Sequence, residues 1–255
     1  MKPLLEIRDL SLSYHTPSGE TSALSHISFD LMPGEFLAVV GPSGCGKSTL
    51  LNVICGLLKP ESGPVLMNNT PVSPGDPRIG YMLQKDHLLE WRNIYKNVLL
   101  GLEIRRELTP KKLSYIEEML HTYGLDKFRS ARPSQLSGGM RQRAALIRTL
   151  ALKPELLLLD EPFSALDYQT RLNVSDDIGR ILKKEKKPAI LVTHDISEAI
   201  SMADRVIILT KRPASVARII PIDLEIKERT PLSSRNAPDF KSYFNQIWKE
   251  LNNHA

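Results

Sequence analysis

The sequence has little cysteine and no long uncharged apolar run. Only two of its 255 residues are cysteines, Cys45 and Cys55, and they form no C-x-x-C pair. This excludes a disulfide framework and a C-x-x-C metal site and predicts a reducing compartment. No apolar stretch reaches the roughly 18 residues that a membrane-spanning helix needs, and residues 1–6 lack the apolar core of a signal peptide. These absences predict a soluble chain whose membrane role, if any, requires a partner.

The charge balance is also modest. Lys plus Arg total 34 and Asp plus Glu total 29, which gives a net charge of +5. A mildly basic balance does not imply nucleic acid, because it also suits a protein that docks near an anionic membrane face. The length allows one large domain or two small ones, and we find no internal repeat.

One glycine-rich stretch reads G-x-x-x-x-G-K-S. It lies between an apolar, β-prone run at 36–40 and an apolar run of helix length at 49–58, and it comprises Gly41, Pro42, Ser43, Gly44, Cys45, Gly46, Lys47, Ser48 and Thr49. Glycines let backbone N–H groups approach phosphate oxygens, and the following helix adds its positive end. Lys47 would then contact the β- and γ-phosphates, and Ser48 would bind Mg²⁺. This phosphate loop predicts nucleotide binding.

Polar residues follow three other apolar runs. The run 156–159 leads into Asp160 and Glu161, 189–193 leads into His194, and 79–83 leads into Gln84. Asp160 can hold Mg²⁺ and Glu161 can accept a proton from an attacking water. The carboxyl ends of parallel strands meet at one edge of an α/β sheet, so Gln84, Glu161 and His194 are expected to converge there. Taken alone, Gln84 and His194 would have ordinary structural roles.

Three further features are open to two interpretations each. Ser137-Gly138-Gly139 opens a helix and can form a second anion site, although a capped helix start explains it equally well. Tyr14 ends the first predicted strand and can stack on adenine or pack on its own sheet. Asp167 follows Ser164-Ala165-Leu166 and can cap the next helix.

The order of these runs predicts an α/β fold. Residues 1–225 are expected to form one domain with a mostly parallel sheet, an N-terminal antiparallel β subdomain and a helical insert at about 85–150. Within the insert, a helical stretch is expected from Trp91 and a second helix after the capping residue Thr109. Residues 226–255 are expected to form a polar linker and an amphipathic closing helix.

Taken together, these motifs resemble the nucleotide-binding subunit of an ATP-binding-cassette (ABC) transporter. Tyr14, the phosphate loop, Gln84, the signature, the acidic strand end, the Asp167 loop and His194 follow one another in the family's order and extend over nearly the whole chain, to about residue 215. The signature residues are Ser137, Gly138, Gly139 and Gln142 within LSGGMRQ. The resemblance implies a P-loop NTPase (RecA-like) core that binds ATP and Mg²⁺ and hydrolyses ATP.

The family also implies partners. Two copies would pair head to tail, so that ATP on the phosphate loop of one copy is closed over by the signature of the other, with Asp167 at the contact. Glu161 would act as the base, His194 would position the γ-phosphate, and Gln84 would sense Mg²⁺ and nucleotide. The homodimer would lie on the cytoplasmic face of the membrane and energise permease subunits served by an extracytoplasmic solute-binding protein, with no nucleic-acid partner.

Three segments refine the resemblance. They are similar to the importer group for nitrate, sulfonates and taurine, although that group usually has Pro where Glu90 stands: Leu88–Asn93, Glu161–Asp167 and Lys211–Ala214. Two other functional classes of ABC protein are alternatives to an importer subunit: the single-cassette ATPase of an exporter or lipoprotein-release system, and a soluble ABC ATPase that acts on ribosomes or DNA. The Trp91-Arg92 segment argues against the first, and one uninterrupted cassette without heptads argues against the second.

Overall fold

The computed structural model describes residues 2–254 except 18, 186 and 227–228. In this part of the chain a larger sheet contains β3 (Phe36–Val40), β6 (Ile79–Met82), β7 (Leu156–Asp160), β8 (Ala189–Val192), β9 (Arg205–Leu209) and β10 (Val216–Pro221). Their order across the sheet is β10-β9-β3-β8-β7-β6, and only β10 runs antiparallel to its neighbour. A smaller antiparallel sheet, in the order β2-β1-β4-β5, contains β1 (Leu5–Thr16), β2 (Gly19–Leu31), β4 (Val65–Met67) and β5 (Thr70–Pro71).

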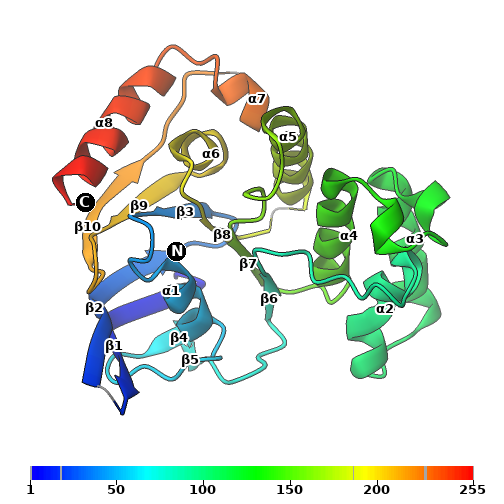
Figure 1. The fold of residues 1–255 in the computed structure, drawn as a ribbon, viewed down its shortest axis with the longest axis horizontal. Coiled ribbons are helices and arrows are strands. Elements are labelled where there is room, and N and C mark those ends of the chain that lie inside the picture. Colours follow the sequence, from blue (N-terminus) through cyan, green and yellow to red (C-terminus); the bar gives the residue numbers. More distant parts are fainter. Residues whose placement is uncertain (1, 18, 186, 227–228, 255) are drawn as a thin grey trace.

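The helices of the described residues surround the larger sheet. They are α1 (Lys47–Ile54), α2 (Ile94–Ile104), α3 (Pro110–Thr122), α4 (Gly138–Leu150), α5 (Tyr168–Lys184), α6 (Ile196–Met202), α7 (Pro231–Ser234) and α8 (Phe240–Asn253), with short 3₁₀ turns at Asp126–Phe128 and Pro133–Gln135. Figure 1 shows α2, α3 and α4 as a lobe at one side, and the smaller sheet with α1 below the larger one. None of these helices has the length and apolar character needed to cross a membrane.

The strands of the larger sheet are apolar along their length because both faces are covered. Alternate residues of β3 belong to different cores: Ala38 belongs to the core formed with α2 to α6 and α8, whereas Leu37 belongs to the core formed with α1 and the smaller sheet. The same alternation separates Leu157 from Leu158 in β7. This pattern arises because successive side chains of a strand point to opposite faces of the sheet, and both faces of this sheet are buried. The predicted α/β core with a mostly parallel sheet, the antiparallel β subdomain and the helical insert are confirmed.

Polar side chains fix where several helices begin. Thr109 Oγ1 accepts a hydrogen bond from Lys112 N at 3.4 Å, and Asn93 Oδ1 accepts one from Lys96 N at 2.8 Å. The sequence correctly predicted the first of these caps. The expectation of helix from Trp91 was wrong by three residues, because Asn93 has an extended backbone and caps α2, which starts at Ile94.

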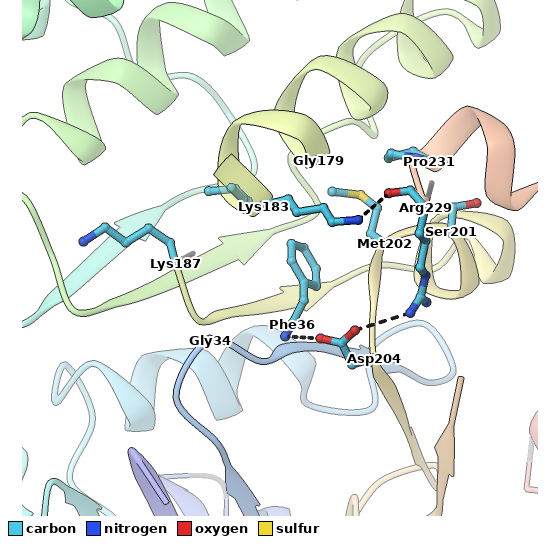
Figure 2. Close-up of a pocket in the computed structure, with 11 residues that line it drawn as sticks. Gly34, Phe36, Gly179, Lys183, Lys187, Ser201, Met202, Asp204, Arg229 and Pro231 are labelled. Atoms are coloured by element: carbon cyan, nitrogen blue, oxygen red, sulfur yellow. Dashed lines mark hydrogen bonds and ion pairs between the residues drawn. The ribbon is translucent and has the colours of Figure 1, made fainter. Parts of the chain in front are cut away.

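The segment after β10 is packed against the domain. Figure 2 shows Arg229 beside Asp204, at the amino end of β9; Arg229 Nη1 lies 3.3 Å from Asp204 Oδ1, and Lys183 Nζ donates to the carbonyl oxygen of Arg229 at 3.1 Å. A cavity of about 430 Å³ lies here, and its lining includes Phe36 and Pro231. Within the segment expected as a polar linker, Arg229 and α7 therefore contact α5 and α6. The division at residue 225 stays a prediction, and 227–228 lie outside the described residues.

Candidate functional site

The phosphate loop joins β3 to α1 and holds Lys47 within its curve. Lys47 Nζ donates hydrogen bonds to the carbonyl oxygens of Gly41 at 2.9 Å and Pro42 at 3.0 Å, and the residue is only 7% exposed. Gly44 and Gly46 have φ values of +70° and +127°, which residues with a Cβ rarely adopt. The loop therefore combines a pre-positioned ammonium group with the backbone freedom that an anion-binding loop needs.

A small cavity of about 180 Å³ lies on this loop. Its lining residues are Ser43, Gly44, Gly46, Lys47, Ser48, Thr49, Glu161 and Arg212. Six of them belong to the predicted loop, and Glu161 reaches the cavity from the end of β7. Arg212 was missed as a site residue: Arg212 Nη2 donates to the carbonyl oxygen of Gly44 at 3.0 Å. Its position late in the sequence gave no signal that it folds back onto the phosphate loop.

A hydroxyl and a carboxylate meet at the start of α1. Ser48 Oγ donates to Asp160 Oδ1 at 3.1 Å, and Tyr81 Oη donates to Asp160 Oδ2 at 3.3 Å. Burial raises the pKa of Asp160, although the hydrogen bonds from Ser48 and Tyr81 oppose this rise. Oxygen ligands of these two kinds suit Mg²⁺, so Ser48 and Asp160 fit the predicted metal site. Tyr81 was seen in the sequence only as part of an apolar strand.

The three polar strand ends converge as predicted. His194 Nδ1 lies 3.2 Å from Glu161 Oε2, and Gln84 Nε2 donates to the same oxygen at 3.3 Å. The register explains this, because β7 pairs with β6 on one side and with β8 on the other. Glu161 has a φ of +44°, an uncommon conformation for a residue with a side chain and typical of functional sites. The convergence is confirmed, whereas the chemical roles stay predictions.

Tyr14 lies next to the phosphate loop. Its hydroxyl is 3.1 Å from Thr49 Oγ1, and the residue is 38% exposed. The side chain thus stands at the amino end of α1 with part of its surface open to solvent. This placement leaves the ring available for stacking on a base and also packs it on its neighbours, so both interpretations of Tyr14 stay open.

The signature residues lie on a different part of the molecule. Ser137 caps α4, accepting a hydrogen bond from Met140 N at 3.3 Å. A Cβ on Gly138 would come within 2.8 Å of a Leu166 methyl group, and one on Gly139 within 2.7 Å of a Val174 methyl group, so both glycines pack closely against α5 and the loop before it. Gln142 is 3% exposed. None of the four predicted signature residues lines the phosphate-loop cavity, and Figure 1 shows α4 in the helical lobe, away from α1.

Asp167 begins α5. Its Oδ1 accepts a hydrogen bond from Thr170 N at 3.0 Å, which lowers the pKa of the carboxyl group, and the predicted cap is confirmed. The preceding loop connects this cap to the catalytic candidates, because Ser164 Oγ donates to the carbonyl oxygen of Glu161 at 3.0 Å. Asp167 therefore lies at the end of the segment that starts at Glu161.

A phosphate loop between strand and helix, with an acidic strand end beside it, defines a P-loop nucleotide hydrolase. Comparison with known proteins narrows this class. Residues 24–164 match the family model described as ABC transporter. The protein YtlC of Bacillus subtilis, named as an ABC transporter ATP-binding protein, is 45% identical over 97% of this chain and 95% of its own length. The chain belongs to the ABC transporter ATP-binding family and is an ATPase.

Other relatives carry more specific names. The nitrate transport protein NasD of Klebsiella oxytoca is 38% identical over 88% of this chain and 87% of its own length. The aliphatic sulfonates import ATP-binding protein SsuB of Bacillus licheniformis is 37% identical over 97% of this chain and 94% of its own length. A dimeric, post-hydrolysis structure of the ATP-binding cassette MJ0796 with ADP and Pi is 29% identical, covers 86% of this chain and 99% of that one, and superposes with a TM-score of 0.73.

Proposed function

We propose that this ATPase subunit energises a membrane importer for a small anionic or organic solute such as nitrate, a sulfonate or taurine. The observation that carries the proposal is the similarity, at 38% and 37% identity, to NasD and SsuB, which are named for nitrate transport and sulfonate import. The similarity of Leu88–Asn93, Glu161–Asp167 and Lys211–Ala214 to that importer group supports the same assignment. The transported solute itself would bind other subunits.

In the proposed reaction each side chain has one task. Lys47 binds the β- and γ-phosphates, and Tyr14 stacks on adenine. Ser48, Gln84 and Asp160 would hold Mg²⁺, which when bound would neutralise charge on the phosphate oxygens. Glu161 accepts the proton of the attacking water while His194, 3.2 Å away, orients the γ-phosphate. Proton transfer of this kind is worth about 10²- to 10⁴-fold in rate.

Closure of the site requires a second copy. The signature lies in the helical lobe, whereas the phosphate loop lies on α1, beneath the larger sheet. A head-to-tail homodimer would place Ser137, Gly138 and Gly139 of one copy over ATP bound to the other. The dimeric cassette with ADP and Pi, which superposes on 86% of this chain, supports this arrangement. Asp167 and its loop would then lie at the contact between the copies.

The surface for permease subunits is the segment between Gln84 and α2. Trp91 is 74% exposed on this segment. The backbone on either side of Trp91 is held by Asn97, which is fully buried and donates to the carbonyl oxygens of Leu89, Arg92 and Asn93. Glu90 Oε2 accepts a hydrogen bond from Ser134 N at 3.2 Å, close to the signature. A rigid segment with an exposed aromatic residue suits docking. The homodimer would thus sit peripherally on the cytoplasmic face of the membrane.

Co-purification tests the importer assignment. The tagged chain is expressed in its own host, membranes are solubilised gently, and the associated proteins are identified. A multi-span permease together with a secreted or lipid-anchored solute-binding protein is expected, and that protein should be stabilised in a thermal-shift screen by nitrate, taurine or another sulfonate. A permease without a binding protein would favour an exporter or lipoprotein-release system, and recovery with ribosomes or DNA would remove the transport role.

A further inference from the structure

A cluster of charged side chains around one buried carboxyl group, that of Glu198, joins the beginnings of α5 and α6, and the proposed chemistry does not use it. Glu198 on α6 is 3% exposed, and its pKa is raised to about 7, chiefly by burial. The side chain of Arg171 on α5 is 22% exposed, and that of Asp195 is 25% exposed. Buried charges are costly, and apolar side chains of similar volume usually fill such space as well or better. The cluster therefore calls for an explanation beyond stability.

Glu198 is tied to the residues on both sides of His194. Thr193 Oγ1 donates to Glu198 Oε2 at 2.7 Å, and the same hydroxyl accepts a hydrogen bond from Asp195 N at 3.0 Å. The Thr193 N–H donates to the carbonyl oxygen of Val39, the residue two before the phosphate loop, at 3.2 Å. Glu198 therefore orients the Thr193 hydroxyl, and this hydroxyl holds the backbone N–H of Asp195. These hydrogen bonds fix the backbone on both sides of His194.

Arg171 connects this arrangement to the loop that ends at Asp167. Its Nη2 donates to the carbonyl oxygen of Leu166 at 3.3 Å, while its Nη1 lies 3.6 Å from Asp195 Oδ2. Its Nε lies 3.9 Å from Glu198 Oε1 and is buried, with no hydrogen-bond partner among the described residues. One guanidinium group therefore contacts the Ser164–Asp167 loop on one side and the segment after His194 on the other.

Arginine suits such a connection because its planar group presents five donors in a fixed fork, whereas lysine presents one compact charge on a flexible stem. The unused Nε and the 3.9 Å separation from Glu198 leave room for a closer ion pair. A movement of the Arg171 side chain by about 0.7 Å toward Glu198 would bring Nε from 3.9 Å to within hydrogen-bond distance of the carboxylate. Movement of the Ser164–Asp167 loop would then change the hydrogen bonds of the Thr193 hydroxyl with Glu198 and Asp195, and with them the position of His194.

We propose that Arg171 is a positioning residue that couples the Ser164–Asp167 loop to His194 through Glu198 and Asp195. The inference rests on the proposed function, in which that loop meets the second copy and His194 acts at the γ-phosphate. When the second copy contacts the Ser164–Asp167 loop, the change in the loop is thereby transmitted through Arg171 to His194 of the same chain. Arg171 itself touches neither nucleotide nor metal in this scheme.

The test compares Arg171→Met with Arg180→Met in the full-length chain. Arg180 lies on the same helix, but its side chain is 62% exposed and pairs with Asp176 one turn away, so its removal controls for lost charge on α5. Arg171→Met is expected to lower kcat for ATP by about tenfold or more with KM changed less than about twofold, because slight misplacement of a catalytic group lowers the rate steeply. Arg180→Met is expected to keep both constants.

A double variant separates positioning from folding. In Arg171→Met with Glu198→Gln no buried carboxylate is left without its cation, so the thermal midpoint should recover toward wild type, whereas kcat should stay low. Arg171→Lys keeps the positive charge but lacks the planar guanidinium group, so its kcat should also be low. Recovery of kcat in the double variant, full kcat in Arg171→Lys, or a kcat for Arg171→Met equal to that of Arg180→Met would overturn the proposal.

Glu161→Gln, assayed in parallel, distinguishes this inference from the function on which it rests. If Glu161→Gln is inactive and Arg171→Met turns over normally, only the coupling role of Arg171 is wrong. If Glu161→Gln turns over at the wild-type rate, the assignment of the catalytic site itself fails.

Discussion

The two edges of the larger sheet both carry charged side chains, but they use them differently. At the amino edge Arg229 donates to Asp204 and to the carbonyl oxygens of Ile200, Ala203 and Ile222, so its charge is surrounded by oxygen atoms of the same chain. At the carboxyl edge Lys47 binds only two neutral carbonyl oxygens and has no carboxylate partner among the described residues.

The difference separates stability from function. A cation paired with a carboxylate, as Arg229 is with Asp204, contributes to folding and leaves little of its charge for a ligand, whereas a cation held by carbonyl dipoles alone, as Lys47 is, keeps its full charge for an incoming anion. The same contrast holds for carboxylates. Asp204 accepts hydrogen bonds from Phe36 N and Arg229, while Glu161 is held in a φ of +44° beside a histidine. Substitutions at the two edges should therefore affect different measurements.

The largest effect is expected for Glu161→Gln. Removing the proposed base should lower kcat for ATP hydrolysis by about 10²-fold or more, while the introduced amide keeps a similar shape and leaves the phosphate loop intact. ATP binding should persist, and a dimer should accumulate in the presence of ATP and Mg²⁺. Steady-state hydrolysis and size-exclusion chromatography measure the two results. Full turnover would remove Glu161 from the role of base.

At the amino edge of the sheet we expect a substitution to lower stability and to leave ATP hydrolysis unchanged. Arg229→Met should lower the free energy of unfolding by about 2 kcal/mol, because carbonyl oxygens and Asp204 lose a charged donor. For a chain of this size that corresponds to a fall of about 4–8 °C in the thermal midpoint. The KM and kcat for ATP should stay at their wild-type values below the transition. A variant with normal stability and impaired hydrolysis would contradict the separation of the two edges.

A smaller effect concerns pH. Burial raises the pKa of Glu198 to about 7 from an ordinary 4.5, so the folded chain binds more protons than the unfolded chain between these values. The contribution of Glu198 to stability is therefore fully present below about pH 4.5 and is lost as the pH rises through about 7. The wild type should lose stability over this window relative to Glu198→Gln. Equal pH dependence of the two unfolding midpoints would show that Glu198 does not titrate there.

Much of the site was predictable because its signals are local. The phosphate loop, the acidic end of β7 and the cap at Asp167 each depend on a few neighbouring residues, and parallel strand order brings Gln84, Glu161 and His194 to one edge. Sequence spacing could not show that Arg212 folds back onto Gly44, because that contact joins residues 168 positions apart. Nor could it show that Arg229 packs on α6, since a polar, proline-containing segment has the composition of a linker.

The most direct test of the head-to-tail site mixes two inactive variants. Lys47→Ala should bind no nucleotide, and Ser137→Arg should bind ATP but block closure over the second copy's site. A mixed dimer contains one intact site, formed by the phosphate loop of the Ser137→Arg copy and the signature of the Lys47→Ala copy. If the two variants are mixed in equal amounts and pair at random, about half of the dimers are mixed. Each mixed dimer has one intact site instead of two, so the mixture should show about a quarter of the wild-type ATPase activity. A mixture no more active than its two components, although both fold and Ser137→Arg binds ATP, would contradict the shared site.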